Sequence, residues 1–231
     1  MKKFFLLLIG FFVIFAGFVY FRFEQNRFSH DSSIFSPLPK KTDLSFKLKS
    51  VGEIWEPDLA LAKELNSKPE VTAIAALTYD ITKDSLLYEK NINKRLPMAS
   101  LTKIMTAIVA LEADPIDKKI FISKSAATVG ENAMGLTAGE ELSLEKLLYG
   151  LMLPSGNDAA EAIAQGSSIG RRNFVTAMNT KAQDLGLKDT NFTNPSGLEG
   201  DGNQYTTVAD LLVMSRYALK SPDFLKIVST V

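Results

Sequence analysis

Ser100 and Lys103 stand three residues apart in the stretch Leu96–Ala107, and their types and spacing are suited to nucleophilic chemistry. Apolar residues at helical spacing follow them, which predicts a helix with Ser100 in its first turn. On a helix, positions i and i+3 share a face with Cβ atoms about 5–6 Å apart, so the Lys103 amine can reach the Ser100 hydroxyl. A serine hydroxyl needs a positioned base to act as a nucleophile. The stretch therefore predicts a catalytic Ser-Lys pair, although a Ser-x-x-Lys spacing also arises by chance.

The other residue types of the 231-residue chain narrow the possible chemistry. The chain has no cysteine, which excludes disulfides, a cysteine nucleophile and thiolate metal sites. Its single histidine, His30, lies in a polar stretch, which disfavours both a Ser-His-Asp triad and a multi-histidine zinc site. We expect no metal and no cofactor, and lysine is the most available base. The formal net charge of zero gives no reason to expect a nucleic-acid partner.

A second polar group stands in Leu153–Ala160, where a turn leads into a predicted helix. Pro154 and Gly156 flank Ser155, so its side chain can project from a turn of fixed shape. Asn157 offers both an amide donor and an acceptor. Together these two polar side chains could relay a proton and bind a substrate peptide. The alternative is structural, because Ser, Asn and Asp before a helix are common capping residues.

The N-terminal segment, residues 1–21, has the pattern of a membrane anchor. Met1-Lys2-Lys3 precedes an uncharged apolar run from Phe4 to Phe21, whose length is near the lower bound for a bilayer-spanning helix. No small-residue cleavage pattern follows, which favours an uncleaved anchor over a cleaved secretory signal. We expect a single-pass cell-membrane protein with its domain on the extracytoplasmic side. The alternative is a secreted or periplasmic protein after signal cleavage.

Residues 22–56 have the composition of a flexible linker, and residues 57–231 have that of a folded domain. The linker is rich in Ser, Asp, Lys and Pro, which resist packing into a core. Its simplest role is to space the domain from the membrane.

The pattern of the domain predicts an α+β fold. Val71–Tyr79 and Ser85–Glu89 form a predicted hairpin, and Lys119–Ser123 is a possible short strand. Beyond the Ser100 helix, which ends by Asp114, helices are expected over Leu144–Met152, Asp158–Gln165, Arg171–Leu185 and Thr207–Leu219, the last with Thr206 or Thr207 as N-cap. Residues 225–231 form an apolar, β-branched run with no cap. This mixture predicts helices packed on an antiparallel sheet.

The two polar stretches together resemble one protein family. Pro97–Ala107 is similar to the active-serine motif of the serine-type D-alanyl-D-alanine carboxypeptidases, which are low-molecular-mass penicillin-binding proteins of the penicillin-recognising superfamily. Leu148–Ala160 is similar to their second motif, Ser-x-Asn, with its flanks. Gly135–Glu140 and Asn194–Leu198 also match the family pattern, with Ser196 where many members have histidine. The resemblance covers roughly residues 68–231 and implies a β-lactamase/transpeptidase-like fold.

The resemblance implies a role for each site residue. Ser100 attacks the carbonyl between the last two D-alanines of a peptidoglycan stem peptide, and Lys103 takes the Ser100 proton. Ser155 relays the proton toward the leaving D-alanine, and Asn157 binds the peptide carbonyl of the substrate. The implied partners are the stem peptide and β-lactams, the latter as covalent inhibitors. Lys103 can act as a base at neutral pH only if its surroundings lower its pKa.

The third motif of the superfamily, Lys-Thr-Gly or a close variant on a strand that lines the site, has no match in this sequence. Lys41-Thr42-Asp43 lies in the linker and lacks the glycine. We therefore expect a member truncated before the third-motif strand, with impaired or absent activity. The alternatives are a non-catalytic peptidoglycan-binding or scaffold protein, and a D,D-endopeptidase if the full chain is longer. A class A β-lactamase is disfavoured, because those enzymes usually carry Ser-Asp-Asn where Ser155-Gly156-Asn157 stands.

Overall fold

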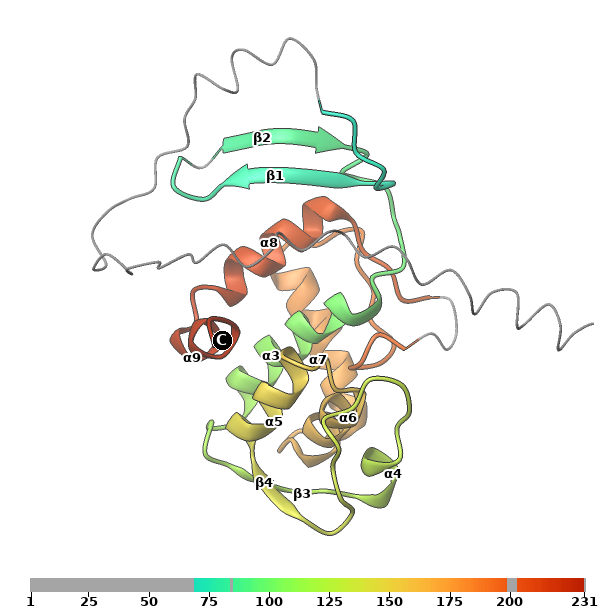
Figure 1. Cartoon of the computed structure of the whole chain (residues 1–231), viewed down its shortest axis with the longest axis vertical. Helices are drawn as coiled ribbons and strands as arrows, with labels where there is room; N and C mark the ends of the chain where they lie inside the picture. The colour runs from blue at the N-terminus through green and yellow to red at the C-terminus, as the bar shows by residue number, and fades with distance from the viewer. Residues whose placement is uncertain (1–68, 84, 199–202, 231) are drawn as a thin grey trace, which may run out of the picture. The chain divides into compact units, whose positions relative to one another are not determined.

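The computed structural model of the chain describes residues 69–83, 85–198 and 203–230 (Figure 1). The predicted anchor, residues 1–21, and the predicted linker, residues 22–56, lie outside these ranges, as does the predicted start of the domain at residue 57. Within the described ranges, no helix combines the length and apolar character needed to cross a membrane.

An antiparallel hairpin forms at the N-terminal end of the described chain, as the sequence predicted. Strand β1 (Ala76–Asp80) pairs with β2 (Ser85–Lys90), and the register shifts once between Thr78 and Tyr79. In the connecting turn, Asp80 Oδ1 accepts hydrogen bonds from the backbone N–H groups of residues 82 and 83, at 2.9 and 3.0 Å. Such side-chain acceptors are why aspartate favours tight turns.

The remaining elements build a mainly helical body below the hairpin. They are, in chain order, the 3₁₀ turn η1 (Ala99–Leu101), α3 (Thr102–Ala113), β3 (Lys119–Phe121), α4 (Lys124–Ala127), β4 (Glu141–Ser143), α5 (Leu144–Met152), α6 (Asn157–Gly166), α7 (Gly170–Asp184), α8 (Val208–Ala218) and α9 (Pro222–Val228). Strands β3 and β4 pair with each other and not with the hairpin. The described chain is therefore α+β, but with two separate strand pairs at opposite ends of the body, where we expected helices packed on one antiparallel sheet (Figure 1).

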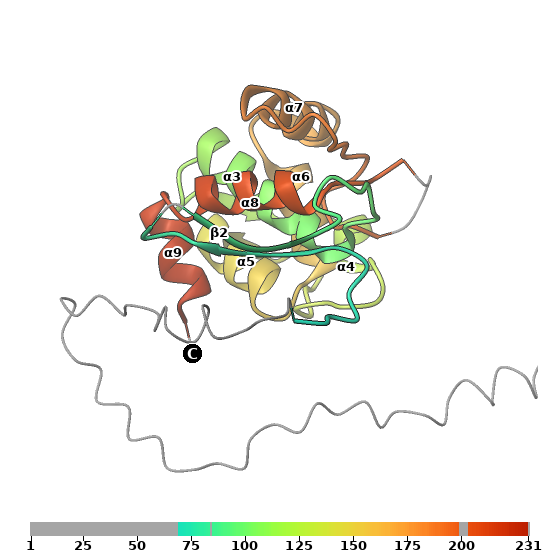
Figure 2. The same ribbon diagram turned by 90° about the horizontal axis from the view of Figure 1, so that it is seen from above.

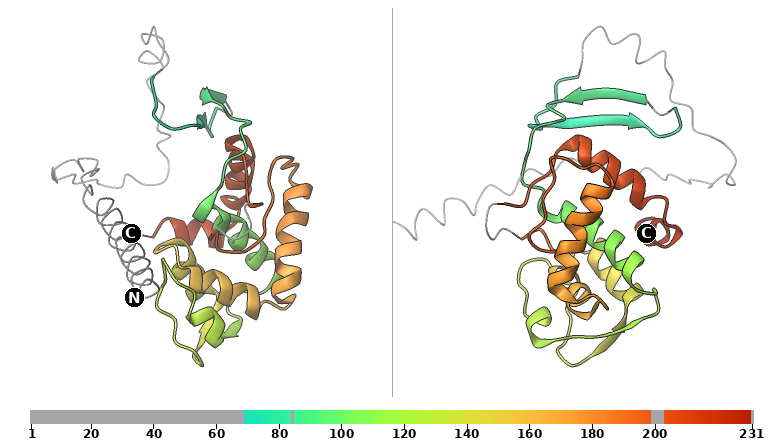
Figure 3. Two further views of the ribbon diagram at one scale, coloured as in Figure 1. Left: turned by 90° about the vertical axis from the view of Figure 1, so that its right-hand side faces the viewer. Right: turned by 180° about the vertical axis from the view of Figure 1, so that it is seen from behind.

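Helix α3 is the centre of the core. It lies between α5 and α7 and also contacts α6 and α8 (Figures 2 and 3). Met105, Ile108 and Val109 are each at most 4% exposed. Helix α6 packs closely because small side chains line it, and Ala159, Ala160, Ala162 and Ala164 are all buried. A helix buried on nearly every side can hold a residue rigidly, and α3 holds Lys103 this way.

Side-chain caps define where several of these helices begin. Ser143 accepts a hydrogen bond from the backbone of Lys146 at the start of α5, and Thr207 accepts one from Asp210 at the start of α8. The cap at Thr207 confirms one of the two predicted candidates. Each such cap contributes about 1 kcal/mol to helix stability.

The C-terminal run departs from the sequence expectation. The sequence indicates an uncapped, β-branched run over residues 225–231, but residues 222–228 form helix α9. Ser221 caps this helix by accepting from the backbone of Phe224, and Pro222 occupies its first turn, where a missing N–H does no harm. Phe224 and Ile227 share one face and are buried. The cap and this burial together outweigh the modest helix disfavour of β-branched residues.

Candidate active site

Ser100 and Lys103 lie within hydrogen-bond distance of each other. The Lys103 ammonium donates to Ser100 Oγ at 3.1 Å and to Asn157 Oδ1 at 2.7 Å. Lys103 is only 2% exposed, whereas Ser100 is exposed and open to an incoming substrate. The structure therefore brings together three of the four predicted site residues, with a buried base behind an accessible hydroxyl.

The backbone around Ser100 differs in detail from the predicted first helical turn. Ser100 sits in the 3₁₀ turn η1, two residues before α3 begins, and Met98 anchors the turn in the core at 3% exposure. Ala99 adopts a left-handed backbone with φ of 46°, which costs an L-residue about 1–2 kcal/mol. The hydroxyl thus stands at the N-terminus of α3, where the helix dipole favours developing negative charge.

The buried position of Lys103 changes its proton affinity. Burial lowers the pKa of the Lys103 ammonium from 10.5 to about 8, and the negative charge of Glu131 opposes this shift. A pKa of about 8 leaves roughly a tenth of the lysine neutral at pH 7, whereas an unperturbed lysine is almost wholly charged. Desolvation therefore lowers the Lys103 pKa, as Lys103 requires in order to act as a base at neutral pH.

Asn157 connects Lys103 to the loop that precedes β4. Its backbone N–H donates to the carbonyl of Asn132 at 2.7 Å, and its side-chain Nδ2 donates to the carbonyl of Gly130 at 3.1 Å. These two carbonyls flank Glu131, whose backbone is left-handed with φ of 66°. Asn157 thereby holds the Glu131 segment beside the buried lysine.

The alternative reading of Ser155 and Asn157 as helix caps does not match the geometry. Gly156 is the N-cap of α6 and no side chain caps that helix. The Ser155 hydroxyl is buried and has no hydrogen-bond partner in the described structure, and its backbone is left-handed with φ of 59°. A buried hydroxyl without a partner costs about 1–3 kcal/mol. The Ser155 hydroxyl therefore forms no hydrogen bond with Ser100 or Lys103, and Ser155 lies two residues before Asn157 in the sequence.

Asp158 is a structural member of the site that the sequence analysis missed. It is 1% exposed, and its two carboxylate oxygens accept hydrogen bonds from the backbone of Met134, Gly135, Leu136 and Ala159, at distances from 2.8 to 3.1 Å. These hydrogen bonds attach the loop before β4 to the start of α6. Its place directly after Asn157 was the available signal, since acidic residues favour the first turn of a helix.

Among the described residues, no group of three or more histidine, cysteine, aspartate or glutamate side chains is placed to hold an ion. The arrangement of Ser100, Lys103 and Asn157 instead suits nucleophilic attack by a hydroxyl whose proton passes to an amine.

Comparison with known proteins identifies the family. Residues 62–230 match the model of the D-alanyl-D-alanine carboxypeptidase family, peptidase family S11. The chain is 40% identical over 152 residues to D-alanyl-D-alanine carboxypeptidase DacF of Bacillus subtilis, a match that covers 63% of this chain and 38% of that protein.

Two solved structures match over most of the described region. The D-alanyl-D-alanine carboxypeptidase DacD from Francisella tularensis has a TM-score of 0.66 and 37% identity, covering 70% of this chain and 40% of that one. Penicillin binding protein 6B from Escherichia coli has a TM-score of 0.66 and 34% identity, covering 71% and 55%. The chain thus spans between 38% and 55% of the length of these relatives. It belongs to the D-alanyl-D-alanine carboxypeptidase family of serine peptidases and is a homologue of penicillin-binding proteins.

Proposed function

We propose that the chain forms an acyl-enzyme on Ser100 and acts as a serine-type D,D-carboxypeptidase that trims the terminal D-alanine from peptidoglycan stem peptides. One observation carries this proposal: a buried lysine with a lowered pKa stands 3.1 Å from the hydroxyl of an exposed serine. The family membership supplies the substrate class.

In the proposed reaction, neutral Lys103 accepts the Ser100 proton as Ser100 Oγ attacks the carbonyl carbon of the D-Ala–D-Ala bond. The tetrahedral intermediate then collapses and the C–N bond breaks. The leaving amine takes up a proton passed from Lys103 through the Ser155 hydroxyl, and free D-alanine departs. Water hydrolyses the resulting ester and restores Ser100. Asn157, already bonded to Lys103, binds the peptide carbonyl of the substrate.

The printed sequence holds no Lys-Thr-Gly triplet, and in relatives of this superfamily such a motif lines the site. These 231 residues supply the Ser100–Lys103 pair, which performs the first half of the proposed reaction, the acylation of Ser100. Release of the acyl group and recognition of the substrate carboxylate are separate steps, and each is measured on its own.

The test is the intact mass of the full 231-residue chain, in mild detergent, after incubation with benzylpenicillin. Ser100→Ala tests the nucleophile, and Ser125→Ala serves as a matched control because Ser125 is also an exposed hydroxyl. We expect one penicilloyl adduct on the wild type and on Ser125→Ala, and none on Ser100→Ala. A folded wild type without an adduct would refute acyl-enzyme formation, and an adduct on Ser100→Ala would place the nucleophile elsewhere.

The substrate distinguishes the remaining functions. Release of D-alanine from a stem pentapeptide supports a carboxypeptidase, and cleavage of a cross-linked dimer instead supports a D,D-endopeptidase. If the chain binds peptidoglycan fragments but forms no penicilloyl adduct and cleaves neither substrate, a non-catalytic binding protein is supported.

We further propose the organisation that the sequence predicts: a membrane anchor in residues 1–21, a linker in residues 22–56, and a β-lactamase/transpeptidase-like domain in residues 57–231 on the extracytoplasmic side. The apolar run from Phe4 to Phe21 supports the anchor. Alkaline extraction of membranes and sequencing of the mature N-terminus test it. Retention with an intact N-terminus supports the anchor, and a soluble product that begins beyond the apolar run contradicts it.

A further inference from the structure

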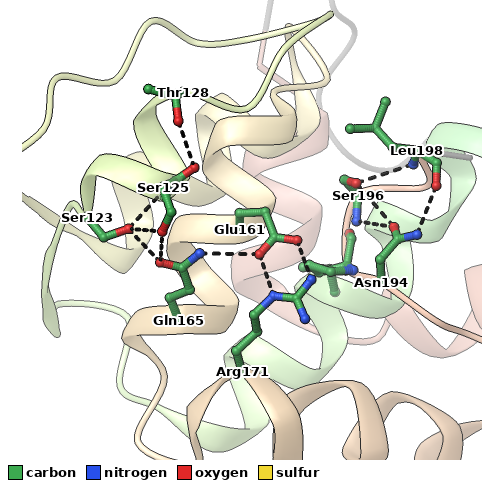
Figure 4. Close-up of polar contacts among 12 residues, drawn as sticks. Ser123, Ser125, Thr128, Glu161, Gln165, Arg171, Asn194, Ser196 and Leu198 are labelled. Atoms are coloured by element: carbon green, nitrogen blue, oxygen red, sulfur yellow. Dashed lines mark hydrogen bonds and ion pairs between the residues drawn. The ribbon is translucent and has the colours of Figure 1, made fainter. Parts of the chain in front are cut away.

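Residues 194–198, here called the 194–198 turn, are held together by the side chain of Asn194. Its Oδ1 accepts hydrogen bonds from the backbone N–H of Ser196 at 3.1 Å and of Gly197 at 2.8 Å, and from the Ser196 hydroxyl at 3.2 Å. Its Nδ2 donates to the carbonyl of Leu198 at 2.9 Å (Figure 4). One amide side chain therefore sets the shape of the whole turn.

The turn presses against the backbone of η1. Gly197 has a left-handed φ of 89°, and a Cβ added there would collide with the carbonyl of Ala99 and lie 3.0 Å from the Ser100 nitrogen. Only a glycine fits this contact, for reasons both of space and of backbone conformation. Ala99 and Gly197 are thus left-handed residues in direct contact, one beside the nucleophile and one in the turn.

Two side chains, Thr106 and Gln204, attach the turn to α3. The buried Thr106 hydroxyl donates to the carbonyl of Pro195 at 2.7 Å. Gln204 Oε1 accepts from the backbone of Thr193 and of Asn194, while its Nε2 donates to Thr102 Oγ1 at 2.9 Å. The N-terminal end of the turn is therefore held on α3, and Gly197 rests on the segment that carries Ser100.

The polar atoms of Asn194 have no capacity left for a substrate. Oδ1 already accepts three hydrogen bonds, and Nδ2 donates to Leu198 and, at 3.5 Å, to Thr193 Oγ1. An amide of this kind has two acceptor lone pairs and two donor hydrogens. Any effect of Asn194 on the reaction must therefore pass through the shape of the turn.

We infer that the 194–198 turn positions the nucleophile: Asn194 shapes the turn, and Gly197 holds Ala99 and Ser100 in the geometry that places Ser100 Oγ beside Lys103. Asn194 and Gly197 are positioning residues and contact no substrate. This inference rests on the proposed acylation of Ser100. A displacement of about 1 Å at a reacting atom costs roughly a hundredfold in rate, so a loosened turn has a measurable effect.

The experiment compares Asn194→Ala with Asn179→Ala in the full chain. Asn179 is a matched control, because its side chain accepts from the backbone N–H of Phe192 at 2.9 Å and donates to its carbonyl at 2.7 Å. Both asparagines bind the same connection between α7 and α8, but the Asn179 bonds are made away from η1. Asn194→Asp keeps the acceptors for Ser196 and Gly197 but loses the donor to Leu198, so we expect its effect to lie between those of the wild type and Asn194→Ala.

The first readout is the second-order rate constant for acylation by a fluorescent penicillin, measured beside the thermal midpoint. We expect a loss of about tenfold or more for Asn194→Ala and about a hundredfold for Gly197→Ala. Asn179→Ala is expected to stay within about threefold of the wild type, even where its thermal midpoint falls as far as that of Asn194→Ala.

The second readout, amide hydrogen exchange, needs no acylation. The backbone N–H of Leu101 donates to the Met98 carbonyl, and that of Thr102 donates to carbonyls within η1. The exchange rates of these two amides therefore report the stability of η1. We expect these two amides to exchange about tenfold faster in Asn194→Ala and unchanged in Asn179→Ala. If the wild type is not acylated at all, the proposed function fails, and the exchange comparison alone decides the inference.

Three results overturn the inference. One is an equal effect of Asn194→Ala and Asn179→Ala on both readouts. The second is faster exchange with an unchanged acylation rate, since η1 would then not limit the nucleophile. The third is slower acylation with unchanged exchange, since Asn194 would then act on the substrate and not through η1. If Asn194→Ala does not fold, Asn194→Ser takes its place, with a smaller effect expected in the same direction.

Discussion

The ammonium of Lys103 lies closer to Asn157 Oδ1, at 2.7 Å, than to Ser100 Oγ, at 3.1 Å. The amide oxygen orients the amine without adding a negative charge, so it does not cancel the pKa depression that burial causes. A carboxylate in the same place would hold the lysine protonated. The neutrality of residue 157 is therefore part of what makes Lys103 available as a base.

Asn157→Asp tests this relationship. A carboxylate beside Lys103 favours its charged form, so the Lys103 pKa rises by one unit or more and less of the base is neutral at pH 7. We expect acylation at pH 7 to slow by about tenfold or more. Penicillin acylation measured from pH 6 to 10 checks this, with Asn173→Asp, at an exposed position of α7, as the control. An unchanged midpoint would show that Asn157 does not tune the lysine.

The pH dependence of the wild type follows from the same pKa. Acylation needs neutral Lys103, so its rate is low below the pKa, rises through a midpoint at about pH 8, and levels off above it. Lys103→Arg keeps the positive charge over this whole range and is expected to form no adduct. Rates of fluorescent-penicillin labelling at closely spaced pH values give the midpoint. A midpoint near 10.5 would mean that Lys103 is not desolvated in solution.

Glu131→Gln is expected to move that midpoint in the acid direction. The Glu131 charge raises the pKa of Lys103 against the larger lowering by burial, so its removal lets the pKa fall further. More lysine is then neutral at pH 7, and acylation there becomes faster. Glu141→Gln on β4 is the control, since Glu141 is exposed and does not act on Lys103. The pH profile of acylation measures both variants, and a midpoint shifted to higher pH contradicts the assignment.

Asp158→Asn is expected to destabilise the fold. Four backbone N–H groups lose a charged acceptor, and the new amide hydrogens face donors, so we expect the free energy of unfolding to fall by roughly 3 kcal/mol. Denaturant titration of the purified chain measures this. Asp189→Asn, which breaks the exposed ion pair with Arg95, is the control and should change little. Equal effects at the two positions would contradict the role of the buried carboxylate.

Local patterns predicted much of the helical body. The predicted Leu144–Met152 matches α5 at both ends, because Ser143 caps a helix whose apolar face is well defined. The Ser100–Lys103 contact was also predictable, since it spans a single turn. Helix α9 was not predicted, because β-branched residues favour strands, although Ser221-Pro222 at its beginning is a helix start signal.

The long-range contacts were out of reach of spacing arguments. Asn157 reaches Lys103 across 54 positions of the chain, and Gly197 meets Ala99 only once α3 and α7 have packed. The depth at which Lys103 lies, and hence its pKa, depends on the whole core around α3. Residue types indicated which groups could react, but tertiary packing decides which of them touch.

Ala99, Glu131 and Ser155 share a left-handed backbone, and each lies in a segment that meets Lys103 or its partners. A short peptide that carries Ser-x-x-Lys does not keep the geometry seen here, because it is too short to form a stable helix and nothing holds its backbone in the left-handed region. If the motif were moved onto another helix, its residue types and spacing would be preserved but its reactivity would be lost. A protein engineer must therefore move all three segments around the lysine, together with the packing that holds their backbones in the left-handed conformation.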